Sequence, residues 1–398
     1  MKRIYIGRRA ALAGGVAAFA SPAVLRAQTD PIKLATLTPL TGAGGSYGPT
    51  MAKVAASVVE EVNKAGGVLG RRVVLVSEDD QTSPEPAVRA ARKLIDVDKV
   101  VAIMGTWASS VTTAVAPLCW ESKTFLCTVS GADSITLLPH QGFLIRTQPN
   151  STLQVTRVGE FILSLGAKKV FTMIPQTPFT QATFDILNAV LPKGGATHQS
   201  LIYDDKKTTY RTEVDQALRT SPDVILANGY TPDSIVLLKD IYRAGFKGKI
   251  LGFAYSINQK LIDQIGQPEV VEGVYTFAPS PAEGSTAYEK VKAAVGSANP
   301  DPYTCQVYDH TNMVLMSMAF AKEASGTAIK DNIRKVTQGG GKPVDNAADG
   351  IKAIAAGEKV DYTGASGPCD FDDKGDILDC KFRYEQIKSG KFTVVKIA

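Results

Sequence analysis

Residues 32–80 read IKLATLTPLTGAGGSYGPTMAKVAASVVEEVNKAGGVLGRRVVLVSEDD, and this stretch decides the fold. Its first seven residues are apolar and β-branched, which is typical of a buried strand. Residues 50–64 then place apolar side chains at helical spacing, and Gly66-Gly67 ends that helix because glycine adopts positive φ at little cost. A second strand is predicted at 72–78. The order strand, helix, strand indicates a parallel sheet with helices on its faces.

The same alternation continues to about residue 279. Further strands are predicted at 100–105, 124–128, 169–174, 197–203, 224–228, 249–252 and 274–278. Helices are predicted between them at 86–97, 110–120, 153–165, 179–191, 210–220, 234–244 and 258–265. So many strand–helix units predict an α/β protein with two parallel sheets, each covered on both faces.

The pattern changes in the last third of the chain. Helices are predicted at 286–295, 306–325, 328–336 and 349–356, and a β-rich end at 364–397. Within that end, the polar run Asp372 to Asp376 separates two short extended segments, which indicates a hairpin. We expect this C-terminal part to return and complete the first domain.

The first 27 residues are predicted to be a twin-arginine export signal. Basic residues including Arg8-Arg9 precede the uncharged run 10–25, and Ala27 is the expected cleavage residue. The run is too short and too rich in alanine for a typical membrane span, although a retained membrane anchor is the alternative. We therefore expect a mature protein that works in the periplasm.

Charge gives no indication of a nucleic-acid or membrane partner. The chain has 44 basic and 39 acidic residues, a formal charge of +5. The predicted signal contains five of the basic residues and none of the acidic ones, so 39 of each remain in the mature protein. A balanced chain does not attract nucleic acid or anionic lipid by its net charge.

Motifs for catalysis, cofactors and metals are missing. The glycine-rich segment 42–48 follows a strand, but Tyr47 takes the place of the third glycine of a dinucleotide fingerprint. The three histidines are far apart in sequence and show no ligand spacing. There is no nucleophile elbow. We expect a protein that is not an enzyme and needs no cofactor or metal.

Several segments resemble the periplasmic leucine/isoleucine/valine-type binding proteins of ABC importers. At the start of the chain these are 39–42 (PLTG), Tyr47-Gly48, 62–70 (VNKAGGVLG) and 78–80 (EDD). Further similar positions follow in order: Gly105, Ser109-Ser110, 130–132, Arg146-Thr147, Gly229-Tyr230, Gly252 and 371–376. The resemblance extends over residues 31–398.

This resemblance implies a type I periplasmic binding protein fold. Such a fold has two Rossmann-like lobes with parallel sheets, joined by three crossover strands, and a ligand cleft between the lobes. The expected lobes are 31–147 with 278–378, and 148–277 with 379–398. The resemblance also implies a receptor, acting as a monomer, that closes around a small ligand and presents it to an ABC permease.

The resemblance places a carboxylate-binding site at two loops. Ser109, with Ser110 beside it, would begin a helix, and Ala132, Asp133 and Ser134 would follow the next strand. Unpaired N–H groups at a helix N-terminus bind anions without any basic side chain. The alternative is that Ser109 only caps its helix.

Two departures from the family concern the ligand's amino group. Ala254 stands where amino-acid receptors of this family have a glutamate that pairs with the ammonium, and Phe179 stands where they have a tyrosine. A buried ammonium without its counter-charge would cost several kcal/mol. We therefore expect a ligand without an α-amino group. The alternative is an amino-acid receptor in which Asp133 pairs with the ammonium.

Aromatic side chains are expected at the cleft, namely Tyr47, Trp107, Phe179, Tyr230 and Tyr255. Flat apolar walls with one anion-binding end suit a planar aromatic carboxylate. Some of these side chains could instead belong to the lobe cores. A periplasmic sensor domain that feeds a regulator would have the same fold and is the other functional alternative.

Among the five cysteines, Cys369 and Cys380 flank the predicted hairpin, so they are candidates for a cross-strand disulfide in an exported protein. Cys119 and Cys127 could pair or remain buried thiols, and Cys305 is left over.

Overall fold

The computed structural model describes residues 30–398, so the predicted export signal lies outside the described residues. All elements and contacts given below belong to one unit, Pro31–Ala398. Within the described residues, no helix has both the length and the apolarity that a membrane crossing requires.

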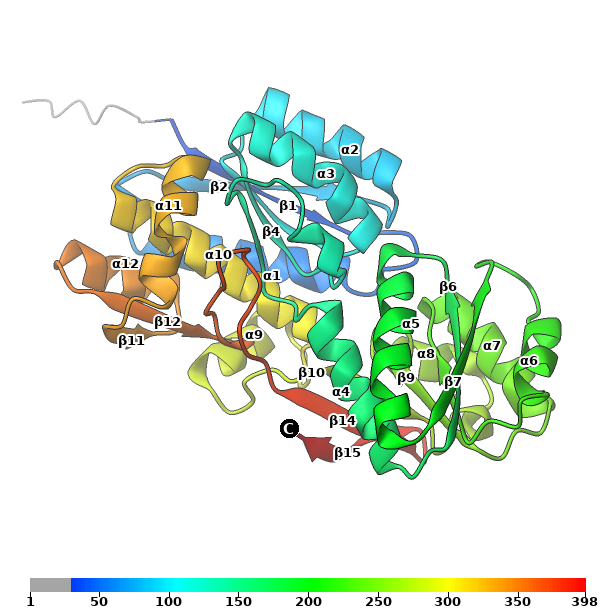
Figure 1. Ribbon diagram of the computed structural model, residues 1–398. Helices are drawn as coiled ribbons and strands as arrows, with labels where there is room; N and C mark the ends of the chain where they lie inside the picture. The colour runs from blue at the N-terminus through cyan, green and yellow to red at the C-terminus, as the bar shows by residue number, and fades with distance from the viewer. Residues whose placement is uncertain (1–29) are drawn as a thin grey trace, which may run out of the picture. The chain divides into compact units, whose positions relative to one another are not determined.

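The first sheet has five strands in the order β2-β1-β3-β4-β5, and every neighbouring pair is parallel. Its strands are β1 (Ile32–Thr38), β2 (Val73–Asp79), β3 (Ala102–Thr106), β4 (Phe125–Thr128) and β5 (Leu144–Arg146). The connecting helices are α1 (Gly48–Lys64), α2 (Pro84–Arg92), which a π-helical turn extends to Asp98, and α3 (Ser109–Ser122). Figure 1 shows α2 and α3 side by side on one face of this sheet and α1 on the other.

The second sheet has seven strands in the order β15-β14-β10-β9-β8-β6-β7. Five of them form a parallel array: β6 (Lys169–Pro175), β7 (Thr197–Tyr203), β8 (Val224–Ala227), β9 (Lys249–Phe253) and β10 (Tyr275–Pro279). The antiparallel hairpin of β14 (Phe382–Lys388) and β15 (Lys391–Ile397) extends this array beside β10. The helices are α4 (Ser151–Ser164), α5 (Pro178–Val190), α6 (Arg211–Leu218), α7 (Thr231–Arg243) and α8 (Gln259–Ile265).

Each face of the second sheet has its own hydrophobic core. Residues of α4 and α5 form one core with the sheet, and residues of α6, α7 and α8 form the other. This is the covering on both faces that the strand–helix alternation predicts.

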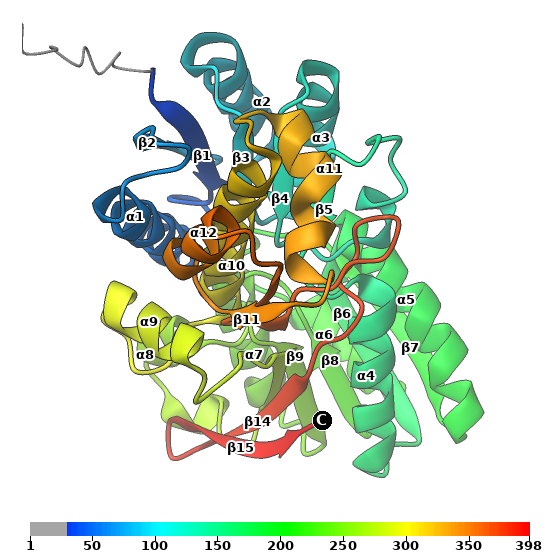
Figure 2. The same cartoon turned by 90° about the vertical axis from the view of Figure 1, so that its left-hand side faces the viewer.

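The last third of the chain returns to the first sheet. The helices α9 (Thr286–Val295), α10 (Pro302–Ala321), α11 (Gly326–Thr337) and α12 (Ala347–Ala355) share one hydrophobic core with β1 to β5. Figure 2 shows them with the small sheet of β11 (Lys342–Val344), β12 (Val360–Gly364) and β13 (Gly367–Pro368). The chain therefore passes between the two sheets three times, after β5, after β10 and before β14. The lobe boundaries at residues 147, 278 and 378 stay a prediction.

The predicted hairpin near residue 374 is present, but it does not join the two cysteines beside it. Phe371 and Ile377 form an antiparallel bridge, and the N–H of Leu378 donates to the carbonyl of Asp370 at 2.9 Å. This register places Cys369 opposite residue 379, one position away from Cys380, and neighbouring residues on a strand point to opposite faces. All five cysteines are free, so the candidate disulfide between Cys369 and Cys380 is not present.

Candidate functional site

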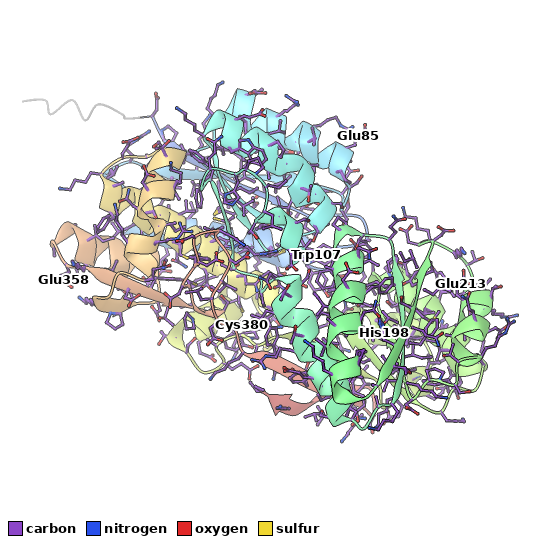
Figure 3. All side chains as sticks on the ribbon, in the orientation of Figure 1. Glu85, Trp107, His198, Glu213, Glu358 and Cys380 are labelled. Atoms are coloured by element: carbon purple, nitrogen blue, oxygen red, sulfur yellow. The ribbon has the colours of Figure 1, made fainter. Side chains whose placement is uncertain are left out.

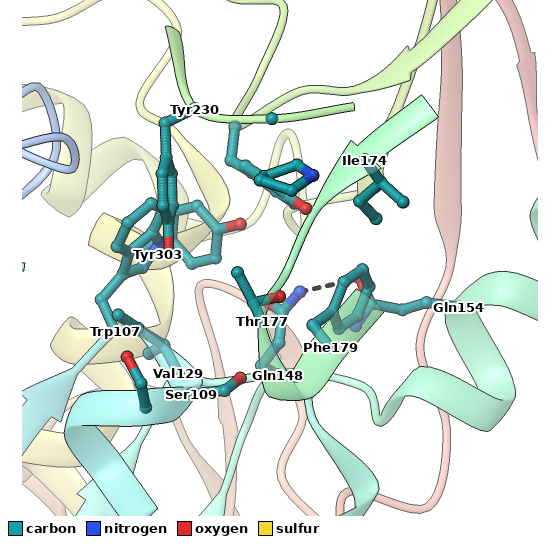
Figure 4. Close-up of a pocket in the computed structure, with 16 residues that line it drawn as sticks. Trp107, Ser109, Val129, Gln148, Gln154, Ile174, Thr177, Phe179, Tyr230 and Tyr303 are labelled. Atoms are coloured by element: carbon teal, nitrogen blue, oxygen red, sulfur yellow. Dashed lines mark hydrogen bonds between the residues drawn. The ribbon is translucent and has the colours of Figure 1, made fainter. Parts of the chain in front are cut away.

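A cavity lies where the carboxyl ends of strands from both sheets meet (Figure 4). Most of its lining residues lie at or just after the ends of β3, β4, β6, β8 and β9, and they include Trp107, Val129, Ile174, Gly229 and Tyr255. Figure 3 shows Trp107 between the elements of the two sheets. About 60 Å³ is open to the centres of water-sized molecules. This space exceeds the ~10–15 Å³ that a single water requires, so the cavity has room for a small ligand.

Three helices point their N-termini at this cavity. The N-cap residues of α3, α5 and α7 are Ala108, Thr177 and Tyr230, and all three line it. A helix N-terminus carries a partial positive charge and unpaired N–H groups, so their convergence favours an anion. The Thr177 side chain caps α5 by accepting from the N–H of Thr180 at 3.2 Å. Ala108 has no side chain that can cap α3, so its N-cap residue leaves the first N–H groups of α3 without a side-chain acceptor.

Ser109, the first residue of α3, connects this helix to the loop after β4. Its Oγ accepts a hydrogen bond from the N–H of Ala132 at 3.2 Å. A hydroxyl that accepts in this way still has its own hydrogen to donate. Ser109 and Ser110 both line the cavity, whereas Ala132 is buried beside it. The predicted pair of loops is thus brought together, with Ser109 and Ser110 at the cavity.

A buried ion pair supports the loop after β4. Arg146, at the end of β5, donates from Nη1 to the carbonyl of Ala132 at 2.6 Å and to that of Ser130 at 3.4 Å. Its Nε donates to Asp376 Oδ1 at 2.8 Å, and Asp376 belongs to the short hairpin in which Phe371 pairs with Ile377. Arg146 is fully buried. Because the guanidinium binds the two carbonyls, the loop backbone is fixed next to Ser109.

Asp133 and Ser134 do not line the cavity. The Asp133 carboxylate accepts from the N–H of Thr152 at 3.2 Å and from its hydroxyl at 2.8 Å, so it serves the first turn of α4. Ser134 is exposed. None of the described side chains that line the cavity is acidic or basic. A ligand ammonium would therefore have no counter-charge at the cavity wall.

Five of the described aromatic side chains form part of the cavity wall. Trp107 lies 5.7 Å from Tyr230, 5.8 Å from Tyr303 and 6.1 Å from Tyr255 between ring centroids. Phe179 lies 6.3 Å from Tyr255. Burial, together with the nearby Asp233 carboxylate, raises the pKa of Tyr230 to about 12, so its hydroxyl stays protonated at neutral pH. The predicted residues Trp107, Phe179, Tyr230 and Tyr255 thus lie together at the cavity.

Tyr47 and Ala254 lie behind this wall. Tyr47 stacks on Trp107 with 5.4 Å between centroids. Its hydroxyl donates to the carbonyl of Ala254 at 3.2 Å and accepts from Asn258 Nδ2 at 2.8 Å. Tyr47 is the N-cap of α1 in the first sheet's layers, whereas Ala254 and Asn258 follow β9 of the second. These hydrogen bonds therefore join the two halves of the molecule without lining the cavity.

Several lining residues escaped the sequence analysis, among them Gln148, Gln154, Thr177 and Tyr303. Gln148 follows β5, a three-residue strand that the sequence pattern does not reveal. Tyr303 lies at the start of α10, nearly 200 residues from the β3 loop that it packs against. Of these residues, only Thr177 has a signal in the sequence. A threonine followed by proline is typical of an N-cap and the first residue of a helix, and Thr177 precedes Pro178 in this way.

Residues 31–391 match the model of the periplasmic binding protein family, and the chain belongs to that family. It is of the branched-chain amino-acid type. It is 26% identical over 290 residues to a Pseudomonas aeruginosa protein named "Amino acid binding protein", with 71% of this chain and 76% of the relative covered.

Two solved structures show the same fold. The leucine binding protein LivK from Thermotoga maritima is 22% identical, with a TM-score of 0.77 over 92% of this chain and 98% of that one. A solute binding protein from R. palustris in complex with benzoate is 16% identical, with a TM-score of 0.74 over 92% and 96%. The expected type I periplasmic binding protein fold is confirmed.

Family membership sets the general function. The relatives and structural neighbours are solute-binding proteins, so this chain binds a small ligand and is not an enzyme. Membership also implies an exported, periplasmic protein.

Proposed function

We propose that the protein is the receptor of an ABC importer and binds a planar aromatic carboxylate between its lobes. The carboxylate binds at the uncapped N-terminus of α3, where the Ser109 hydroxyl donates a hydrogen bond to it. The ring lies among Trp107, Tyr230, Tyr255 and Phe179. The observation that carries this proposal is the combination of an unpaired helix N-terminus with a cavity wall that is aromatic and uncharged.

The absence of a counter-charge argues against an amino acid. Phe179 lines the cavity without a hydroxyl, Ala254 offers no acidic group, and Asp133 is already bonded to Thr152. An ammonium enclosed here would lose its hydration without an ionic partner, a cost of several kcal/mol. The R. palustris neighbour that is bound to benzoate supports an aromatic acid as a ligand class that this fold can accept.

Ligand binding would shift the protein toward its closed state. Ser109 belongs to the first sheet's layers and Phe179 to the second's, so a ligand that touches both gains its full set of contacts only when the lobes are together. The closed monomer then presents its outer surface to the permease. We further propose that the protein reaches the periplasm by the twin-arginine route, on the basis of Arg8-Arg9.

Calorimetry with three ligands tests the proposal. Benzoate should bind, methyl benzoate should bind at least about tenfold more weakly because it lacks the anionic charge, and leucine should not bind measurably. Trp107 emission should change with benzoate in the wild type, and the change should disappear in Trp107→Phe, in which Trp120 remains as the internal reference. Tight binding of leucine, or equal affinity for benzoate and its ester, would refute the proposal.

A further inference from the structure

Three buried glutamines form a hydrogen-bonded chain that ends at the cavity. Gln306 Nε2 on α10 donates to Gln148 Oε1 at 2.8 Å, and Gln148 Nε2 donates to Gln154 Oε1 on α4 at 3.0 Å. Gln154 Nε2 in turn donates to the carbonyl of Pro149. Their exposed fractions are 1%, 3% and 3%, and Gln148 and Gln154 line the cavity.

The carbonyl of Pro149 fixes the direction of this chain. A carbonyl can only accept, so Gln154 must present its NH₂ group to Pro149 and its oxygen to Gln148. Gln148 must then present its NH₂ group to Gln154 and its oxygen to Gln306. Each NH₂ group carries two hydrogens and uses one of them within the chain. Gln148 and Gln154 therefore each have one N–H that is not used within this chain of glutamines.

Gln306, at the other end of this chain of glutamines, agrees with that direction of hydrogen bonding. Gln306 Oε1 is buried and has no hydrogen-bond partner among the described residues. Buried polar groups are normally paired, so a free acceptor at Gln306 is unusual. The chain of glutamines thus leaves an acceptor unpaired at Gln306 and unused N–H groups at Gln148 and Gln154, both of which line the cavity.

The amide pair lies on one side of the cavity. In Figure 4 the Gln148–Gln154 hydrogen bond lies across from Trp107 and Tyr303. Phe179 lies beside it, because a Cβ added to Gly131 in the cavity wall would meet Phe179 at 3.0 Å and Gln154 Nε2 at 3.1 Å. The absence of a side chain at Gly131 leaves the Gln154 amide open to the cavity.

We propose that Gln148 and Gln154 determine ligand specificity by donating N–H groups to an oxygen on the ring of the ligand, away from its carboxylate. This inference rests on the proposed binding of an aromatic acid at α3. It assigns the ligand to the hydroxylated or otherwise ring-oxygenated acids, because two N–H donors discriminate in favour of an acceptor and against a methyl group of similar size. Gln306 acts through Gln148 as a positioning residue.

Calorimetry with matched ligands tests this assignment. We expect the wild type to bind 4-hydroxybenzoate or 3-hydroxybenzoate about tenfold more tightly than the corresponding methylbenzoate. In Gln148→Met and Gln154→Met, that ratio should fall to about twofold. Gln181→Met is the matched control, because Gln181 lies on α5 outside the cavity and bonds Asp185.

Two negative outcomes can be told apart. If benzoate binds more tightly than its ester but neither hydroxyl position is preferred over methyl, this inference is wrong and the proposed function stands. If no aromatic acid binds, the proposed function fails and the inference fails with it. The wild-type ratios decide both cases even if a glutamine variant does not fold.

Discussion

Replacing Ser109 by alanine separates the two hydrogen bonds that this hydroxyl makes possible. The Oγ accepts from the N–H of Ala132 at 3.2 Å within the protein itself. Its donated hydrogen bond to a carboxylate exists only in the complex. The first bond contributes to folding, and the second contributes to affinity.

The expected magnitudes differ in the same way. Ala132 is 1% exposed, so its N–H would lose a partner inside the protein, and we expect the free energy of unfolding to fall by about 1–3 kcal/mol. A hydrogen bond to a charged group contributes about 1.5–3 kcal/mol, which corresponds to a roughly 10- to 150-fold weaker Kd for the acid. The methyl ester, which carries no charge, should lose much less.

Titration calorimetry of benzoate and methyl benzoate on the wild type and on Ser109→Ala measures this difference, and urea unfolding measures the stability. Ser122→Ala is the control, because Ser122 lies in the last turn of α3 and donates to the carbonyl of Leu118 at 2.7 Å. It should change neither ligand's affinity. A Ser109→Ala variant that loses acid and ester affinity by equal factors, or that keeps full affinity for the acid, would show that Ser109 only holds the loop.

Three further predictions concern a buried ion pair, a buried acid and the contact between the lobes. Asp376→Ala should lower the free energy of unfolding by about 3–5 kcal/mol in urea melts, because it leaves the buried Arg146 unpaired; a loss under 1 kcal/mol would contradict this. Burial raises the pKa of Asp80 to about 7, above the ~3.9 of an unfolded carboxyl, so the folded state holds an extra proton between these values. Its contribution to stability is therefore complete below pH 4 and is lost as the pH rises toward 7; Asp80→Asn should remove this decline in unfolding titrations, and an unchanged pH profile would show that Asp80 is not its source. Tyr47→Phe should weaken acid and ester alike by about 2- to 10-fold in calorimetry, because it removes hydrogen bonds between the lobes rather than to the ligand; a selective loss of the acid would place Tyr47 at the carboxylate instead.

The fold was largely predictable because its signals are local. Ile32–Thr38 and Thr197–Tyr203 begin and end at the predicted residues. Strands β5 and β11 were missed because each has three residues, too few for a periodic pattern. The cysteine pairing failed for a related reason. Proximity in sequence suggested it, but the register of a hairpin is set by its hydrogen bonds and cannot be read from spacing alone.

The candidate site was predictable only where it lies at strand ends. Trp107, Phe179, Tyr230 and Tyr255 each follow a recognisable strand, and the carboxyl ends of parallel strands meet at one edge. Gln148, Gln154 and Tyr303 come from a crossover and two helices, so their meeting depends on packing between distant segments. Asp133 follows a strand whose end lies at the cavity, but its carboxylate accepts hydrogen bonds from Thr152 of α4 and does not line the cavity.

The support of the loop beside Ser109 also fixes when the site can exist during synthesis. Asp376 follows Arg146 by 230 residues. Until the ribosome has released that last segment, the guanidinium has no buried counter-charge, and the first sheet lacks the helices that complete its core. Contacts between such distant residues also form slowly. The nascent chain therefore lacks a finished candidate site until the segment that contains Asp376 has been made, and an exporter of folded proteins would carry it across the membrane only after that point.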